Sequence, residues 1–410
     1  MKYLDFVDLD YRPKRSDIIC TFKLEPDGIS IEEAAGRVAS ESSVGTWTEL
    51  SNVPERIRDL MARVFEIRDK TVKIAYPIDL FELGNIPQLL SSIAGNVFGM
   101  RAIKNLRLED VEFSEEYVRA FKGPGFGIEG VRKILGIRDR PITATVPKPK
   151  VGFDVDEYSR VAYEAWMGGI DLVKDDENLT GQSFIGFEKR LRSVMKIRDI
   201  VENETGEKKS YLVNITSECR EMIKRAKMVS DYGNEFVMVD IITVGFSALQ
   251  TIRKECEDLN LAIHAHRAMH ASFTRNPDHG ISFGVILKIS RLIGVDNIHV
   301  GTGVGKMVGA VGEIKSLIDL CRSSWYHIKP VFPVSSGGLH PGLIPDIIDL
   351  FGIDVIIQAG GGVHGHPDGT RAGATALREA IDLTLSKRGL EEGGKELRRA
   401  LETWGYVKPK

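Results

Sequence analysis

Short apolar stretches recur along the last two thirds of the chain, and most are followed by a segment in which apolar residues have helical spacing. Eight stretches are predicted to be strands: 142–147, 170–174, 211–216, 236–242, 261–267, 297–301, 330–336 and 354–362. Eight repeats of strand, loop and helix over about 290 residues predict a closed (β/α)8 barrel of the TIM type, whose usual size is roughly 250 residues. An open doubly wound sheet is the alternative, but eight is the number of repeats that closes.

The first 120 or so residues mix strands and helices without strict alternation. Strands are predicted at 18–26, 71–81 and 103–113, and helices at 30–42 and 85–99. Ser30 and Glu33 have the spacing of a capping box. We therefore expect a small α+β domain of ferredoxin-like type at residues 1–121, followed by the barrel at 122–410.

Composition narrows the class of protein. The chain has 410 residues, 42% hydrophobic and 28% charged, with a formal net charge of -3. These values are typical of a globular enzyme, and they offer no broad basic surface for nucleic acid. The N-terminal sequence has acids where a signal peptide needs an apolar core, and no apolar run approaches the roughly 18 residues of a membrane span.

The four cysteines lie far apart, with no CxxC spacing that would suggest a zinc site or a disulfide framework. This cysteine usage fits a reducing compartment. We therefore expect a cytoplasmic protein with neither a nucleic-acid nor a membrane partner.

Polar residues gather where the predicted barrel strands end. Active sites of (β/α)8 barrels are built at this end of the strands, so these side chains are expected to meet at one mouth. In chain order they are Lys148, Lys150, Lys174, Asp175, Asp176, Glu177, Asn214, His264, His266, Arg267, His270, His299, Lys306, Ser335, Ser336, Gly337, Gly338, Gly360, Gly361 and Gly362.

Several of these residues have an ordinary structural interpretation. Asp175 is expected to be a solvated residue or a helix cap, and His264 or His299 a hydrogen-bonded core histidine. The glycine runs could be tight turns, although they follow the seventh and eighth strands, where barrels often bind phosphate through backbone N–H groups. Asp176 and Glu177 differ, because adjacent carboxylates can both supply oxygen to Mg²⁺.

Lys174 has two possible roles. A lysine beside Asp176 and Glu177 is normally held protonated as an ion-pair partner. An unprotonated amine could instead add carbon dioxide and become a carbamate, which would complete a magnesium site with a third anionic oxygen ligand. Spacing and periodicity do not decide between these roles.

Several long motifs carry a resemblance to a known family. TVPKPKVGF, GGIDLVKDDEN, HAHRAMHASFTRNPDHGIS, GTGVGKMVG, PVSSGGLHPG and QAGGGVHGHPDG, with ESSVGTWT and IAGNVFGMRAIKNLRLEDV, occur in order between about residues 34 and 385. They resemble the large subunit of ribulose-1,5-bisphosphate carboxylase/oxygenase (RuBisCO), and most closely its archaeal form III branch.

The resemblance implies a role for each matched residue. Lys174 would carry the carbamate made from activator CO2, and would bind Mg²⁺ with Asp176 and Glu177. Lys148 would be the acid that protonates the nascent carbanion, supported by Lys150. His266 would contact substrate and take part in proton transfer. Lys306 would close over the substrate, and the other implied substrate contacts are Glu41, Thr46, Trp47, Asn96, Arg267, His299, Ser336, Gly337, Gly338, Gly360 and Gly361.

The resemblance also implies the reaction and the partners. Ribulose 1,5-bisphosphate and CO2 would give two 3-phosphoglycerates, and O2 would attack the same intermediate in an oxygenase side reaction. Glu41 and Asn96 would reach the site of a neighbouring subunit, so a homodimer or a larger homo-oligomer of dimers is implied, with no small subunit. The substrate would come from nucleotide (AMP) salvage or a related archaeal carbon pathway.

Two departures from the family pattern bear on function. Val146 stands where plant enzymes have threonine, with Thr145 displaced by one, and the loop sequence KMVG lacks the acid that plant enzymes carry two residues after the lysine. An alternative is a RuBisCO-like enolase or isomerase acting on another sugar phosphate, and a third is a silent phosphate-binding or scaffold protein. The presence of Lys306, Lys148 and His299 favours carboxylation.

Overall fold

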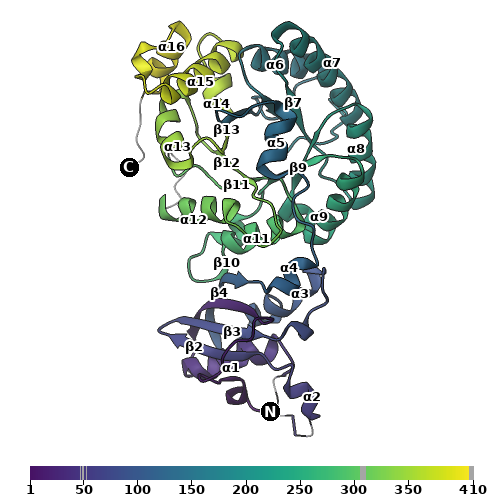
Figure 1. The fold of residues 1–410 in the computed structure, drawn as a ribbon, viewed down its shortest axis with the longest axis vertical. Helices are drawn as coiled ribbons and strands as arrows, with labels where there is room; N and C mark the ends of the chain where they lie inside the picture. Colours follow the sequence, from purple (N-terminus) through teal and green to yellow (C-terminus); the bar gives the residue numbers. More distant parts are fainter. Residues whose placement is uncertain (47, 49, 52, 305–310, 406–410) are drawn as a thin grey trace. The chain divides into compact units, whose positions relative to one another are not determined.

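The chain forms two compact units in a computed structural model, which describes residues 1–46, 48, 50–51, 53–304 and 311–405. One unit comprises Met1–Lys122 and Met269–Leu292, and the other comprises Gly123–Ala268 and Ile293–Lys410. Figure 1 labels their helices and strands. The sequence predicts a division into residues 1–121 and 122–410, and it gives no sign that Met269–Leu292 groups with the first unit.

The first unit contains a five-stranded sheet in the order β10-β4-β1-β3-β2. Its strands are β1 (Ile18–Pro26), β2 (Arg63–Arg68), β3 (Thr71–Tyr76), β4 (Ile103–Glu112) and β10 (Gly280–Ile281). All pairs are antiparallel except β10 with β4. Every second side chain of β1 is buried from Ile18 to Leu24, as expected when one face of a strand covers the core. The predicted small α+β domain is confirmed.

Short helices complete this unit. They are α1 (Ile31–Glu41), α2 (Glu55–Arg58), α3 (Ile86–Ile93), α4 (Glu115–Arg119), α10 (Ala271–Thr274), α11 (Phe283–Ile293) and the 3-10 helices Tyr3–Phe6, Ile78–Leu80 and Asn96–Gly99. Ser30 caps α1 by accepting a hydrogen bond from the backbone N–H of Glu33 at 3.2 Å. The Glu33 side chain binds Arg37 instead of returning to Ser30, so only half of the predicted capping box forms.

The second unit is a closed barrel of eight parallel strands. They are β5 (Ile142–Thr145), β6 (Leu172–Lys174), β7 (Ser210–Asn214), β8 (Phe236–Asp240), β9 (Ala262–His266), β11 (Asn297–His299), β12 (Phe332–Ser336) and β13 (Ile356–Ala359). Each lies within one of the eight predicted stretches or overlaps it closely, which confirms the barrel. The strands are buried on both faces, which explains why they are apolar runs without alternation.

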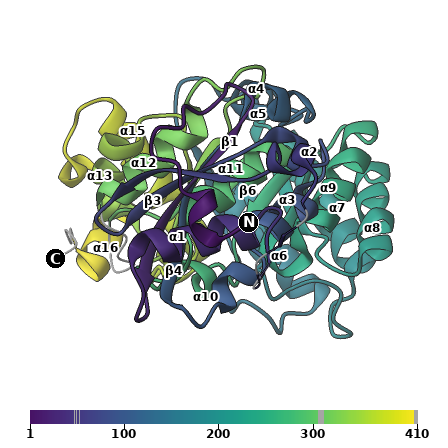
Figure 2. The same cartoon turned by 90° about the horizontal axis from the view of Figure 1, so that it is seen from below.

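Helices surround the barrel. They are α6 (Val155–Met167), α7 (Phe187–Thr205), α8 (Cys219–Asp231), α9 (Ile241–Asp258), α12 (Val311–Arg322), α13 (Ile344–Phe351), α14 (Gly361–His364), α15 (Thr370–Leu385) and α16 (Lys395–Trp404), with 3-10 helices at Pro341–Leu343 and Leu390–Glu392. Helices α7, α8 and α9 follow one another along the outer side of the barrel (Figures 1 and 2).

A further helix, α5 (Gly127–Leu135), closes the end of the barrel at which the strands begin. Its Ile128, Val131 and Leu135 pack against apolar residues at the starts of the strands, among them Phe236 and Phe332. The opposite end, where the strands finish, remains available for polar side chains.

Two further observations concern the cysteines and the polarity of the helices. All four cysteines are free. Among the residues that the structure describes, every helix is too short or too polar to cross a membrane.

Candidate active site

Lys174 is the last residue of β6, and its side chain is completely buried. Its Nζ donates to the backbone oxygen of Asp175 at 2.8 Å and lies 4.0 Å from Oε2 of Glu177. Burial lowers the pKa of the Lys174 amine, although Glu177 and the neighbouring carboxylates act in the opposite direction. The amine is therefore easier to deprotonate than an exposed lysine.

Asp176 faces the same region as Lys148 at the end of β5. Its Oδ2 accepts a hydrogen bond from Lys148 Nζ at 2.8 Å, and its Oδ1 accepts two from Asn178 at 3.1 and 3.0 Å. Burial alone would raise the pKa of Asp176, but the hydrogen bonds from Lys148 and Asn178 bring it below the usual value. Asp176 is thus held as a carboxylate beside Lys174.

Asp175 points away from this region and is wholly buried. It accepts hydrogen bonds from the hydroxyl groups of Tyr158 (2.7 Å) and Tyr211, from Arg190 Nη2 (3.0 Å) and from the backbone N–H of Asn214 (2.9 Å). The expectation that Asp175 is a solvated residue or a helix cap is wrong. Successive residues leaving a strand point to opposite faces, so Asp175 faces the helices while Lys174 and Asp176 do not.

Three histidines from β9 and β11 lie together. The Nε2 atoms of His264 and His299 are 2.9 Å apart, and Nδ1 of His299 is 2.7 Å from Oγ of Ser336. His266 contacts His299 edge to face, with ring centroids 4.8 Å apart, and its Nε2 is 3.7 Å from Oε2 of Glu177. Burial lowers the pKa of all three rings, so they are neutral near pH 7.

Asp240, the last residue of β8, was missed by the sequence analysis. Its Oδ1 lies 2.9 Å from Nδ1 of His266, which leaves Nε2 as the ring atom facing Glu177. The fourth predicted strand is the only one of the eight for which no residue at its end was named. The position of Asp240 at a strand end is the signal that could have identified it. A carboxylate bound to one ring nitrogen fixes the orientation and tautomer of a histidine.

His364 was also missed, since it lies in α14 beyond the eighth strand. Its Nε2 is 2.9 Å from Oγ1 of Thr145, whose hydroxyl also donates to the backbone oxygen of Ala359 at 2.6 Å. Burial lowers the pKa of His364 to about 4, and the charge of Lys148 acts in the same direction. Thr145 is therefore engaged within the barrel wall, and Val146 beside it is buried.

The glycines after β12 and β13 are close to one another. Gly337 and Gly338 have φ values of 111° and 69°, which L side chains rarely adopt. A Cβ on Gly362 would lie 2.0 Å from the backbone oxygen of Leu339, and one on Gly360 would lie 3.1 Å from Cε of Lys148. The φ values support the interpretation of the glycine runs as tight turns. Because Gly360 has no side chain, the Lys148 side chain can pack against it.

Glu41 and Asn96 meet within the first unit. Glu41 ends α1, and Nδ2 of Asn96 donates to its Oε1 at 3.3 Å. Thr46 lines a small cavity of about 120 Å³ with Tyr3 and Ser40.

Four other predicted site residues have few described contacts or none. Lys150 is exposed beyond β5, and Trp47 and Lys306 lie outside the described residues. Arg267 follows β9, and burial lowers its pKa to about 10 although the charge of Glu313 raises it.

The residues around Lys174 offer two carboxylates for a metal ion. Within the described ranges, no group of three or more His, Cys, Asp or Glu side chains is arranged to bind one. Asp176 and Glu177 offer two carboxylates on one side of Lys174. A modification of that lysine could supply a third oxygen.

Two family models together match most of the chain. Residues 127–404 match the family described as ribulose bisphosphate carboxylase large chain, catalytic domain, and residues 5–117 match its N-terminal domain. A protein of Pyrococcus furiosus named ribulose bisphosphate carboxylase is 59% identical over 100% of this chain and 99% of its own length. One of Methanocaldococcus jannaschii with the same name is 48% identical over 98% of this chain and 100% of its own.

Solved structures give the same result. A crystal structure of octameric RuBisCO from Pyrococcus horikoshii in complex with sulfate has a TM-score of 0.97 and 56% identity, covering 100% of this chain and 98% of that one. A dimeric archaeal RuBisCO from Hyperthermus butylicus has a TM-score of 0.94 and 51% identity, covering 99% and 100%. The chain belongs to the ribulose bisphosphate carboxylase large chain family.

Proposed function

We propose that this chain catalyses the carboxylation of ribulose 1,5-bisphosphate, giving two molecules of 3-phosphoglycerate. Relatedness over the whole chain to proteins named ribulose bisphosphate carboxylase supports the reaction. The observation that carries the proposal is the buried amine of Lys174 beside two carboxylates. We assign the chain to the form III branch, and archaeal relatives over its full length support this assignment.

Lys174, Asp176 and Glu177 are proposed to hold Mg²⁺. Carbon dioxide adds to the unprotonated Lys174 amine: a carbon–nitrogen bond forms, one proton is released, and a neutral amine becomes an anionic oxygen donor. The fit is supported by the 4.0 Å separation of Lys174 Nζ from Glu177 Oε2 and by the preference of Mg²⁺ for carboxylate-type oxygens. When bound, the ion would supply Lewis-acid polarisation to the substrate.

The proton transfers are assigned to three side chains. Lys174, once carbamylated, takes a proton from the third carbon of the sugar, which makes the neighbouring carbon nucleophilic toward carbon dioxide. His266, oriented by Asp240, accepts a proton during hydration of the product ketone. Lys148 then donates a proton to the carbanion left when the carbon–carbon bond breaks.

The remaining residues are proposed to hold and enclose the substrate. Arg267, His299 and Ser336 contact the sugar bisphosphate. Gly337, Gly338, Gly360 and Gly361 bind one phosphate through backbone N–H groups, and Thr46 and Trp47 help to bind the other. Lys306 closes over the substrate, stabilises the new carboxylate and excludes water. Lys150 supports Lys148.

The active unit is proposed to be a homodimer or a larger assembly of dimers without a small subunit. Glu41 and Asn96 would reach the site of the neighbouring subunit, with Glu41 pairing with Lys306. The similar structures include one octameric and one dimeric archaeal RuBisCO, which supports a homo-oligomer. We further propose oxygenase side activity, a cytoplasmic location and a substrate supplied by AMP salvage or a related carbon pathway.

The test is incubation with labelled bicarbonate, ribulose 1,5-bisphosphate and Mg²⁺ under anoxia, after activation with bicarbonate and Mg²⁺. Labelled 3-phosphoglycerate is expected from the native chain and none from Lys174→Met, whose uncharged side chain is similar in length. Consumption of substrate without label would indicate the enolase or isomerase alternative. Binding of substrate that needs neither bicarbonate nor Mg²⁺, with no turnover, would indicate a silent binding protein.

Subunit sharing has its own test. Glu41→Gln and Lys306→Ala proteins, each inactive alone, are refolded together. Partial activity is expected if one site combines residues from two chains. Confirmed mixed dimers without activity would contradict shared sites.

A further inference from the structure

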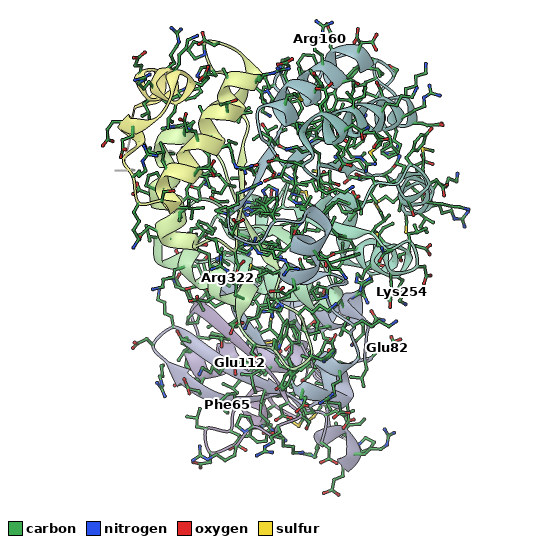
Figure 3. All side chains as sticks on the ribbon, turned by 45° about the horizontal axis from the view of Figure 1, so that its top comes forward. Phe65, Glu82, Glu112, Arg160, Lys254 and Arg322 are labelled. Carbon is green, nitrogen blue, oxygen red and sulfur yellow. The ribbon has the colours of Figure 1, made fainter. Side chains whose placement is uncertain are left out.

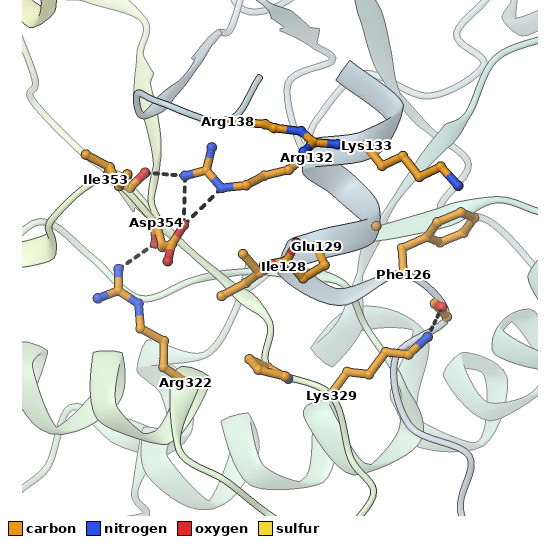
Figure 4. A pocket seen from close by; sticks show the side chains of 13 residues that line it. Phe126, Ile128, Glu129, Arg132, Lys133, Arg138, Arg322, Lys329, Ile353 and Asp354 are labelled. Atoms are coloured by element: carbon orange, nitrogen blue, oxygen red, sulfur yellow. Dashed lines mark hydrogen bonds and ion pairs between the residues drawn. The ribbon is translucent and has the colours of Figure 1, made fainter. Parts of the chain in front are cut away.

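A cavity of about 960 Å³ lies at the end of the barrel where the strands begin, opposite the candidate active site (Figure 4). Its walls come from α5 and from the segments that lead into β12 and β13. Lys329 and Pro330 precede β12, and Ile353 and Asp354 precede β13. Nothing in the proposed reaction uses this end of the barrel.

The lining is strongly cationic. Five basic side chains and two acidic ones contribute to it, which gives the wall a formal charge of +3. The basic residues are Arg132, Lys133, Arg138, Arg322 and Lys329, and the acidic residues are Glu129 and Asp354. The whole chain has a net charge of -3, so the positive charge of this cavity is local.

Arg132 is a fixed part of the wall. Its Nε and Nη2 donate to Oδ1 of Asp354 at 2.9 and 2.7 Å, and its remaining N–H groups donate to the backbone oxygens of Ile137, Arg140 and Ile353. Figure 4 shows this guanidinium facing Asp354. The carboxylate of Asp354 is thereby engaged.

Arg322, the last residue of α12, also lines the cavity, and its hydrogen-bond acceptors are neutral. Its Nη2 donates to the backbone oxygens of Phe351 and Asp354 at 2.6 and 2.5 Å, and its buried Nε has no hydrogen-bond acceptor. Burial lowers the pKa of Arg322, and the charge of Asp354 offsets this only in part. The Asp354 carboxylate is therefore bound by Arg132, and Arg322 is held by backbone oxygens.

Lys133 and Arg138 are exposed at the rim of the cavity. Within the part of the chain that the structure describes, neither has a hydrogen-bond or ion-pair partner. Lys329 donates to the neutral backbone oxygen of Gly125 at 2.5 Å. The charges of Lys133 and Arg138 are thus uncompensated among the described residues.

The N-terminus of α5 is not available to bind an anionic ligand, because it already has an anionic partner. Oδ1 of Asp296 accepts from the backbone N–H groups of Phe126 and Gly127 at 2.7 and 2.8 Å. A ligand in the cavity would therefore be recognised by side chains.

We propose that this cavity is a second ligand site, which binds a small molecule carrying two or more phosphate groups. Guanidinium and ammonium groups are the side chains that bind phosphate oxygens best, and a wall with an excess of three positive charges matches a diphosphate. Ligand sites commonly measure about 300–1,000 Å³, so the cavity admits a molecule of nucleotide size. Phe126 and Ile128 supply an apolar wall for the rest of such a molecule.

The test measures binding of inorganic pyrophosphate and of ADP by titration calorimetry to the full-length chain. The test variant is Lys133→Gln/Arg138→Gln, which removes two exposed charges from the rim. The matched control is Arg160→Gln on α6, whose exposed side chain projects from the outer edge of the barrel (Figure 3). The candidate active site is identical in all three proteins, so differences between them report the cavity.

We expect the double variant to bind pyrophosphate about tenfold or more weakly than the native chain, and Arg160→Gln to bind within about twofold. Carboxylation kinetics and the urea midpoint should stay unchanged, because both substituted residues are exposed. Tighter binding of ADP than of pyrophosphate would identify a nucleotide, and equal binding would identify the phosphates alone. Unchanged binding by the double variant, or an equal loss in Arg160→Gln, would overturn the proposal, as would the absence of binding by both probes.

Discussion

Replacing Asp175 by asparagine should destabilise the barrel severely. Asp175 and Arg190 are both wholly buried, and Oδ2 of the carboxylate lies 3.0 Å from Nη2 of the guanidinium. Asparagine preserves the shape and, with its oxygen toward Arg190, the hydrogen bonds from Arg190 and from the backbone N–H of Asn214. Its amide faces the hydroxyl groups of Tyr158 and Tyr211, which donate to the carboxylate in the native chain and would have to accept instead. What it removes is the negative charge, and Arg190 already has one buried nitrogen, Nη1, without a partner.

The expected loss of unfolding free energy follows from the burial of both Asp175 and Arg190. Removing one partner of a buried ion pair costs about 3–5 kcal/mol, because the other charge is left uncompensated in a medium of low dielectric. No reduction for solvent screening applies, since both side chains are 0% exposed. The retained hydrogen bonds place the expected loss of unfolding free energy for Asp175→Asn at the lower end, about 3 kcal/mol.

The assay is urea unfolding followed by circular dichroism. Asp199→Asn is the matched control, because Asp199 pairs with Arg198 at 2.8 Å but is 61% exposed, and its loss should stay within about 0.5 kcal/mol. The double variant Asp175→Asn/Arg190→Met should recover part of the loss, since the uncompensated charge is gone. A loss below about 1 kcal/mol for Asp175→Asn would refute the argument from buried charge.

Three further predictions concern other parts of the molecule. Burial raises the pKa of Asp171, but its bidentate pair with Arg140 brings the folded value below the usual one. Its stabilisation is therefore present above the unfolded pKa of about 3.9 and lost as pH falls through the folded value. The native chain should have a higher urea midpoint than Asp171→Asn at pH 7, and this difference should become smaller below about pH 4. A difference that stays constant down to about pH 2 would contradict the prediction. Asp240→Asn should lower kcat roughly 10–100-fold with little change in KM, because His266 loses its orienting carboxylate; steady-state kinetics tests this, and an unchanged kcat would contradict it. Chelation of Mg²⁺ from activated protein should abolish carboxylation, with recovery on adding Mg²⁺ and bicarbonate in the native chain and none in Lys174→Met.

The barrel could be predicted because its strands have a strong local signal. Each is an apolar run buried on both faces and bounded by polar or glycine-containing turns, so eight repeats were visible without knowledge of their neighbours. The first unit was harder. β2 (Arg63–Arg68) has mostly half-buried side chains, and β10 contains two residues paired with a strand about 170 positions earlier. Pairing across such a distance leaves no mark on the local pattern.

The sequence predicted which strand ends carry the polar residues, but it did not predict the direction in which their side chains point. The rule that polar residues gather at the ends of barrel strands selected Lys148, Lys174 and His299 correctly as residues of that region. It did not tell which way Asp175 points, because its partner Arg190 lies on α7, 15 positions away along the chain. Asp240 was overlooked for a similar reason, since its role depends on His266 from the next strand.

The order of charges in the segment Lys174 to Glu177 now has a physical explanation. Where the strand ends, residues still alternate between the interior of the barrel and the layer of helices around it. Asp175 ties the segment to Arg190 and two tyrosines in that layer, and Lys174 and Asp176 are thereby held toward the interior. The adjacent acids therefore have different surroundings: Asp175 fixes the backbone, and Asp176 faces Lys148. A lysine could not be kept buried and readily deprotonated on a mobile turn, since a mobile turn would carry it to water.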